Sequence, residues 1–268
     1  MLVGCVGGQE KVTTSGSAGG NPNAPSRWPL NAFPRTVSLS NRYNTAEEAE
    51  LRRAATSWTT NVANGANFFS IPTTLVADRS GVANLDSLLD NQMGIYKATT
   101  WHHSLPGTAL AVTQIFGVRQ NTGTANEYVQ IIEADVLVNW TFSYYPTVSS
   151  GYDLFSVVLH ELGHFLGLAH VYDYTLSSVM FPTIGYSTVF PGPGTNDISL
   201  IRSRYGLGTM APAAARSLAT EDEPALTAED VWSSGKGVRI MMELHADGTC
   251  VHKVDGTQVG SHPSFLGH

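Results

Sequence analysis

One eleven-residue run, residues 160–170, constrains this chain more than any other part of it. It reads His-Glu-Leu-Gly-His-Phe-Leu-Gly-Leu-Ala-His and holds three imidazoles, one carboxylate and two glycines. Histidines four residues apart lie on one helix face, so His160 and His164 are placed to reach one metal ion. Gly167 allows the chain to leave the helix and turn back, which brings His170 to the same ion. Three imidazole nitrogens leave a fourth position open, as in catalytic rather than structural zinc sites.

Glu161, between the first two histidines, is predicted to act on the water that such a zinc would carry. It is too close to His160 in sequence to serve easily as a third ligand. Zinc lowers the pKa of bound water towards 7, and Glu161 would take that proton as the water attacks a carbonyl, then pass it to the leaving amine. The alternative is a buried helix whose histidines are satisfied within the core, without a metal.

A methionine ten residues after His170 extends the pattern. The stretch reads Ser177-Ser178-Val179-Met180-Phe181-Pro182. The long histidine motif followed by such a Met-turn is the signature of the metzincin zinc peptidases. By that resemblance Met180 is expected beneath the metal as an apolar floor and not as a ligand. The alternative is an ordinary core methionine.

The surrounding sequence resembles the matrixin branch of the metzincins, in a divergent form that we expect to be bacterial. Residues 152–159 are similar to the start of the matrixin active-site helix, residues 132–139 to the strand before it, and residues 196–206 to the closing helix. The resemblance implies an α+β fold, with a twisted, mostly parallel sheet, a backing helix and an active-site helix. It also implies a small C-terminal subdomain that holds the Met-turn.

Two positions and one loop depart from the matrixin pattern. Val171 follows the third histidine, where matrixins usually carry Ser or Thr, and Ile184 replaces the Tyr expected two residues after the Met-turn proline. His102 and His103 lack the Asp and further His of the structural-zinc loop. We therefore predict one catalytic zinc, and leave calcium or a second zinc open.

The resemblance also implies where a polypeptide substrate would bind. It would lie as an extended strand along a sheet edge near residues 107–112, held by backbone hydrogen bonds, with Leu110 and Ala111 at its centre. The alternative is that this segment is an ordinary interior strand. Residues 182–190, beginning with Pro182, would shape the pocket beyond the cut bond, where an apolar lining favours a bulky apolar side chain.

Composition narrows the possible locations and partners of the protein. The 268 residues are enough for a sizeable core, and only 14% are charged, while Gly numbers 26 and Pro 13. That balance fits a loop-rich extracytoplasmic protein. A net charge of −7 without any Lys/Arg cluster argues against nucleic acid as a partner. The sequence contains no run of about 20 apolar residues, so it predicts no membrane span.

Two cysteines, Cys5 and Cys250, are too few for a disulfide scaffold. Cys5 ends a Leu-Val-Gly-Cys match to the lipobox of bacterial lipoproteins, so we expect secretion or a lipid anchor to the cell envelope, with residues 1–26 as a disordered tether. The alternative is an incidental cysteine. Cys250 would either cap the zinc from the C-terminal end or be a plain unpaired cysteine.

The rest of the chain divides by composition. We expect a strand at residues 36–39, a helix opened by a capping box at Thr45, and β-rich runs at about residues 94–101, 109–119 and 128–139. A catalytic domain over residues 27–208 is followed by an Ala-, Pro- and acid-rich linker, residues 209–236. Residues 237–268 form a small β-meander with Asp-Gly turns at 247–248 and 255–256. So short a meander cannot stand alone, so it docks on the catalytic domain or a partner, or stays loose.

Three functions fit these observations. The first is a zinc endopeptidase with Glu161 as the general base. The second is a non-catalytic surface lipoprotein that uses a metzincin fold to bind a partner, and the third is a zinc hydrolase of a non-peptide amide. Glu161 favours an enzyme, because a binding module needs no general base there.

Overall fold

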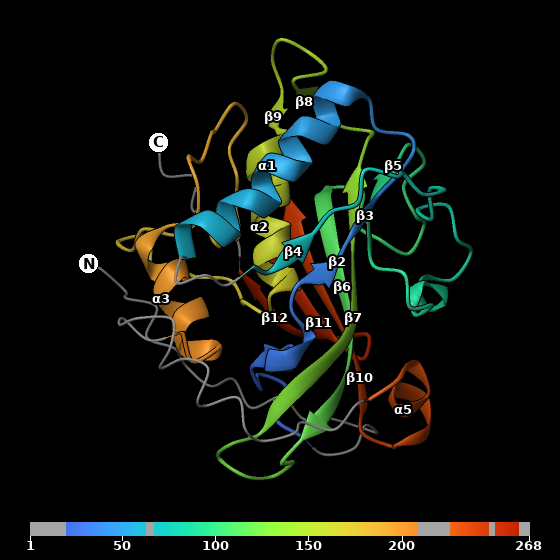
Figure 1. Cartoon of the computed structure of the whole chain (residues 1–268), viewed down its shortest axis with the longest axis vertical. Coiled ribbons are helices and arrows are strands. Elements are labelled where there is room, and N and C mark those ends of the chain that lie inside the picture. The colour runs from blue at the N-terminus through green and yellow to red at the C-terminus, as the bar shows by residue number, and fades with distance from the viewer. Residues whose placement is uncertain (1–19, 63–66, 208–225, 247–249, 263–268) are drawn as a thin grey trace.

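The computed structural model describes residues 20–62, 67–207, 226–246 and 250–262. A sheet of eight strands forms its centre, and two long helices lie over one face of that sheet (Figure 1). Helix α2, Leu154–Phe165, packs on the sheet, and helix α1, Thr45–Val62, packs against α2. Helix α3, Thr195–Arg204, contacts α1. No helix among the described residues is long and apolar enough to cross a membrane.

The central sheet is mixed. Its order is β12-β11-β10-β6-β7-β5-β3, and the short β1 also pairs with β7. The pairs β3–β5, β5–β7 and β1–β7 are parallel, whereas β6 pairs antiparallel with both neighbours and the C-terminal strands add further antiparallel pairs. The parallel part that the family resemblance implies is therefore one half of a larger sheet. The strands are β1 Ser26–Arg27, β3 Ser38–Leu39, β5 Gly94–Ala98, β6 Ala109–Gln120, β7 Tyr128–Asn139, β10 Gly237–His245, β11 Cys250–Val254 and β12 Thr257–His262.

Smaller elements complete the described chain. Two short parallel pairs lie outside the central sheet, β2 (Arg35–Thr36) with β4 (Phe69–Ser70) and β8 (Tyr144–Tyr145) with β9 (Tyr152–Asp153). Two single turns of 3-10 helix, η1 and η2, span Leu30–Ala32 and Leu85–Leu88. A short helix, α5, spans Ala228–Ser233.

The predicted elements are present, with shifted ends. The strand expected at residues 36–39 is divided between β2 and β3, and Ser26, expected in a disordered tether, begins β1. The capping box of α1 starts one residue earlier than predicted. Asn44 accepts the backbone N–H groups of Ala46 and Glu47, both at 3.0 Å, while the Glu47 carboxylate accepts the Asn44 N–H at 2.9 Å. An amide side chain reaches those first-turn donors well, so Asn44 takes the cap from Thr45.

The apolar face of α1 joins the helices to the sheet. Leu51, Ala54, Trp58 and Val62 are fully buried and belong to one core with α2. The indole N–H of Trp58 donates to the carbonyl of Leu159 in α2 at 2.9 Å. This bond fixes the position of α2 along α1, because a buried indole N–H needs an acceptor.

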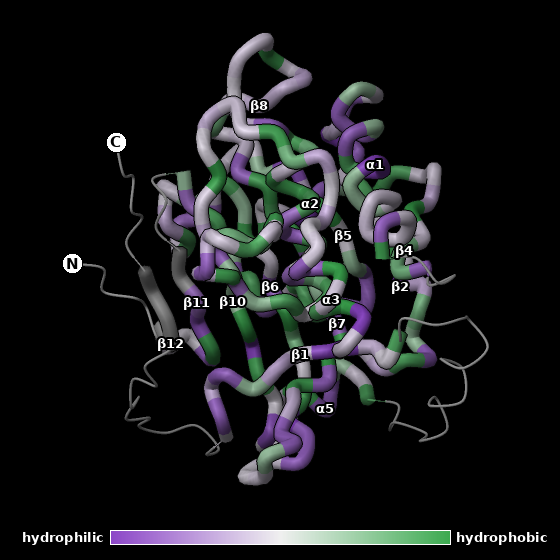
Figure 2. The backbone as a smooth tube through the Cα atoms, turned by 90° about the vertical axis from the view of Figure 1, so that its left-hand side faces the viewer, coloured by the Kyte–Doolittle hydropathy of each residue, from purple (hydrophilic) through white to green (hydrophobic). Residues whose placement is uncertain are grey.

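The C-terminal meander docks on the sheet rather than standing apart. Strand β10 pairs antiparallel with the outer edge of β6, from Gly237 opposite Val118 to His245 opposite Ala109 (Figures 1 and 2). Strand β6 is therefore an interior strand, and the prediction of an open edge at residues 107–112 is wrong for this structure. The reason is that β10 supplies the backbone partners that an edge strand lacks.

One turn of the meander is confirmed, and part of the predicted linker is a helix that was not expected. Asp255 and Gly256 both have positive φ, at 49° and 76°, and form the tight turn between β11 and β12. The other predicted turn, at residues 247–248, lies outside the described residues. Residues 208–225, which include the first part of the predicted linker, also lie outside them. In the rest of that linker, α5 packs Val231 into the apolar cluster of Phe116 and Met241.

Candidate metal centre

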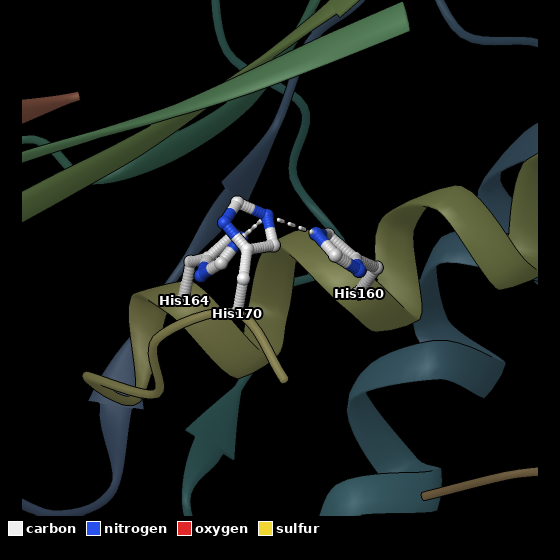
Figure 3. A group of neighbouring side chains, drawn as sticks. All are labelled: His160, His164 and His170. Carbon is white, nitrogen blue, oxygen red and sulfur yellow. Dashed lines mark hydrogen bonds between the residues drawn. The ribbon is translucent and has the colours of Figure 1, made fainter. Parts of the chain in front are cut away.

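The three predicted ligands meet at one point. His160 and His164 lie one turn apart on α2, and His170 lies beyond the end of that helix, so that the three rings turn toward one another (Figure 3). The Nε2 atom of His170 is 3.2 Å from Nε2 of His160 and 3.0 Å from Nε2 of His164. Among the described residues these three form the one cluster of His, Cys, Asp and Glu with metal-ligand spacing.

Backbone carbonyls fix the other ring nitrogens of the two helical histidines. Nδ1 of His160 lies 2.8 Å from the carbonyl of Val179, and Nδ1 of His164 lies 2.8 Å from that of Leu168. Each Nδ1 therefore carries its proton toward a carbonyl and leaves the Nε2 lone pair unprotonated. Lone pairs converging at about 3 Å repel one another unless a cation lies between them, so the donor set fits zinc.

Burial keeps the three imidazoles neutral. It lowers the pKa of His160 to about 4, against the opposing hydrogen bond to Val179. Burial first, and then the neighbouring imidazoles, hold the pKa values of His164 and His170 well below the usual range. A neutral imidazole is the form that binds a metal, so none of the three needs to lose a proton at neutral pH.

The local sequence explains why α2 begins and ends where it does. Asp153 caps the start by accepting the Ser156 N–H at 2.9 Å, as predicted. At the end, Gly167 has φ +86°, its N–H donates to the carbonyl of His164, and the Leu168 N–H donates to that of Gly163. This is a Schellman motif, and it turns the chain back so that His170 returns to the helix.

Replacement of Gly167 by Ala is expected to destabilise the fold by at least about 2 kcal/mol. An L side chain is strained at this positive φ, and its Cβ would overlap the backbone carbonyl of Ser26 in β1. Denaturant unfolding of Gly167→Ala measures the cost, and Gly81→Ala is the control because a Cβ there meets nothing within 4 Å. Equal stability of the two variants would show that the turn tolerates a side chain.

Glu161 follows His160 in α2 and contacts Thr113 of the sheet. Its side chain is fully buried, and Thr113 of β6 donates its hydroxyl to Oε2 at 2.5 Å. The other oxygen, Oε1, is buried and has no hydrogen-bond partner among the described residues. Burial raises the pKa of Glu161 to about 8, and the Thr113 bond opposes that shift. One carboxylate oxygen is thus held by Thr113 and the other makes no hydrogen bond within the described chain. A pKa near neutral pH suits a group that takes a proton from water and then returns it.

The Met-turn packs directly beneath the helix. Met180 is fully buried, and its sulfur occupies the space that a side chain at Gly163 would need. The backbone N–H of Val171 donates to the carbonyl of Met180 at 2.8 Å, which joins the turn to the residue after His170. Met180 thus packs against α2 at Gly163, and its place beneath a metal stays a prediction. Gly163 makes that close approach possible because it has no Cβ.

Sequence reasoning missed the residue that anchors this turn. Asp197 in α3 is fully buried and accepts hydrogen bonds from the Ser178 hydroxyl, from Val179 N at 2.7 Å and from Gly194 N at 2.8 Å. It therefore holds the carbonyl of Val179 where it meets His160. The only sequence signal was an Asp near the start of an expected helix, which on its own reads as a cap.

His102 and His103 form no second metal cluster with any described residue. Their rings stack at 4.5 Å, and Nε2 of His102 lies 3.3 Å from the carbonyl of Ala83. Both histidines line a cavity of about 430 Å³ beside Arg239 and Lys253 of the tail. The zinc-binding histidines are not part of its lining.

The residues predicted to bind substrate are covered in this structure. Leu110, Ala111 and Pro182 are all buried, and Ala111 pairs with Leu244 of β10. The carbonyl of Leu110 accepts the Tyr144 hydroxyl at 2.8 Å. Their assignment to substrate stays a prediction, because β10 lies where the peptide was expected.

Comparisons with known proteins agree with this geometry. The family model described as Matrixin matches residues 54–206, more than half of the chain. Metalloendoproteinase 1 of Glycine max is 43% identical over 60 residues, which are 22% of this chain and 19% of that protein. The match to that relative therefore spans about a fifth of its length. With the three-histidine centre, the Met-turn and this family match together, the chain belongs to the matrixin family.

Proposed function

We propose that this protein is a zinc endopeptidase that uses Glu161 as its general base. The observation that carries the proposal is the convergence of three imidazole Nε2 atoms, together with the buried Oε1 of Glu161, which has no hydrogen-bond partner among the described residues. His160, His164 and His170 would hold the zinc. Bound zinc would polarise the peptide carbonyl and lower the pKa of its water.

The chain's own residues supply the proton transfers. Oε1 of Glu161 takes the proton of the attacking water and later delivers it to the leaving amine. Thr113 holds the second oxygen at 2.5 Å, so the carboxylate keeps one orientation through both transfers. Met180 and Asp197 contribute no proton. They keep the histidine cluster in place from below.

Replacement of Thr113 by Val is expected to lower kcat about tenfold and to leave KM nearly unchanged, because a hydrogen bond to a charged group contributes about 1.5–3 kcal/mol. The shape of the side chain is retained, and only the donor to Glu161 is removed. Steady-state kinetics on the peptide substrate that the digestion below identifies measures both constants. Thr175→Val, at an exposed position, is the control. A raised KM with unchanged kcat would mean that Thr113 binds substrate instead.

The substrate class and location are further parts of the proposal. A polypeptide would bind in extended form along β6 once β10 has left that edge. It would lie between β6 and the segment that begins at Pro182, in contact with Leu110 and Ala111. The family and the low charge content support an extracytoplasmic location. A bacterial source and a lipid anchor at Cys5 stay predictions, and residues 1–19 lie outside the described residues.

Digestion of a denatured protein mixture tests the proposal. The purified zinc-loaded chain is incubated with the mixture, and new termini are identified by mass spectrometry, beside a sample with a zinc chelator. Cleavages present only without the chelator are expected, with a bulky apolar residue after the cut. No cleavage by the zinc-loaded chain, nor by its hairpin-release variant described below, would reject an endopeptidase and favour a partner-binding metzincin fold.

A further inference from the structure

We infer that the C-terminal hairpin, β10–β11, is autoinhibitory. It occupies the edge of β6 where a peptide would bind and so blocks access to the metal centre. This inference rests on the proposed function and names the regulation of the same site. The hairpin follows the matrixin segment at residues 54–206, so it is an addition to that segment. The structure shows which segment occupies the edge of β6: β10 pairs with β6 at nine positions, including Ala109 and Ala111.

The end of β10 lies in the place expected for a substrate. Leu244 pairs with Ala111 and His245 with Ala109, both antiparallel, on one side. On the other side His245 makes a parallel bridge with Thr183, directly after Pro182. One strand thus lies between β6 and the segment after the Met-turn, and its backbone partners are those that a bound peptide would use.

Polar contacts hold this end of the hairpin. Nδ1 of His245 lies 2.9 Å from the Thr108 hydroxyl and Nε2 lies 3.0 Å from the Glu243 carboxylate. Glu243 is fully buried and also accepts Lys253 of β11 at 2.6 Å. The N–H of Ala246 donates to the carbonyl of Thr108 at 2.8 Å. The strand is therefore anchored beside the metal centre by satisfied bonds, and not only by apolar contact.

The apolar face of the hairpin belongs to the same core as the active-site helix. Val238, Ile240, Met242 and Leu244 alternate along β10, are nearly fully buried, and pack in one cluster with residues of α2. Figure 2 shows β10 between β6 and β11, so that the hairpin extends the sheet beside the helix. A peptide cannot reach the same edge while this face is in place.

A second tail residue faces the centre. His252 in β11 pairs with Met242, which in turn pairs with Thr113, so the three side chains lie on one face of the sheet. Its Nε2 atom is buried and has no hydrogen-bond partner among the described residues. His252 is not part of the ligand cluster. The hairpin thus closes the site by occupying the edge, whereas the predicted cap by Cys250 would act by binding zinc.

Two opposite variants of the full chain test the inference. Ile240→Asp places a charge in the buried face of β10 and releases the hairpin. Leu200→Asp makes the same change at a partly exposed site on α3 and is the matched control. Gln114→Cys with Met241→Cys locks the hairpin. Since the Arg119 N–H donates to the carbonyl of Lys236, the Gln114–Met241 pair falls among the non-hydrogen-bonded pairs, where Cα atoms are close enough for a disulfide. The locked variant is made without Cys5 and Cys250.

Two readouts are taken. One is cleavage of denatured protein, and the other is binding of an apolar peptidyl hydroxamate, which needs both zinc and the β6 edge but no catalysis. We expect both to rise at least about tenfold in Ile240→Asp, and to fall at least about tenfold in the oxidised lock. Reduction of the disulfide with a phosphine should return both readouts to those of the parent chain without Cys5 and Cys250. The same reductant should leave the readouts of that parent unchanged.

The outcomes separate the two proposals. Hydroxamate binding that follows the hairpin, with no cleavage in any variant, would support the hairpin inference and reject the endopeptidase. Equal binding and cleavage in the released, locked and control proteins would overturn the inference. Activation by Cys250→Ala alone, without effect of Ile240→Asp, would also overturn it in favour of a cysteine cap. If Ile240→Asp does not fold, the reversible lock decides the question by itself.

Discussion

Replacement of Glu161 by Ala is expected to reduce peptide cleavage by about 10²- to 10⁴-fold, the usual contribution of a positioned general base. Zinc should remain at one ion per chain, because the converging Nε2 atoms of the three histidines do not involve the carboxylate. Cleavage rate and zinc content are measured on the same sample. This combination separates loss of the base from loss of the metal.

Glu161→Gln sharpens that result. Glutamine keeps the size of the side chain and its contact with Thr113, but it cannot take a proton from water. We therefore expect it to be as inactive as the alanine variant. Glu50→Gln on α1, where the carboxylate pairs with Arg53, is the matched control and should retain full activity. Substantial cleavage by Glu161→Gln would remove Glu161 from its role as the base.

Replacement of His164 by Ala is expected to abolish activity through loss of the metal. The loss of affinity should exceed the factor of about 10–100 that follows removal of an outer hydrogen-bond partner of a ligand. Zinc stabilises the native state by mass action, by about 2.7 kcal/mol at 100 times Kd. The Tm of the unmodified chain should therefore fall when a chelator is added, whereas the Tm of His164→Ala should not respond.

A matched variant tests whether the effect is specific to the cluster. His102 and His103 stack on each other and line a separate cavity, so the double replacement by Ala should keep one zinc and the same chelator response. Calorimetric titration of zinc into the metal-free proteins gives affinity and stoichiometry for each. Retained zinc binding in His164→Ala, or two zinc ions in the unmodified chain, would contradict the single three-histidine site.

The sequence by itself determined the chemistry of the centre. Two histidines four apart on a helix share a face whatever surrounds them, and Gly167 is suited to the turn that returns His170 to that helix. The long strands β6 and β7 and the active-site helix also followed from local patterns. These features depend on residues close in sequence, so their geometry is set by the backbone period and by local caps.

Only the tertiary structure decided how that centre is supported and whether it is open. Asp197 and Thr113 act on Val179 and Glu161 across 18 and 48 residues of chain, and no local pattern marks such pairs. The docking of β10 was also not marked by any local pattern. Its alternation predicted a strand, but the choice between docking, partner binding and a loose tail depends on whether the edge of β6 offers unpaired backbone groups and an apolar face. That edge does, so a segment that cannot bury enough surface alone folds onto it and covers the site.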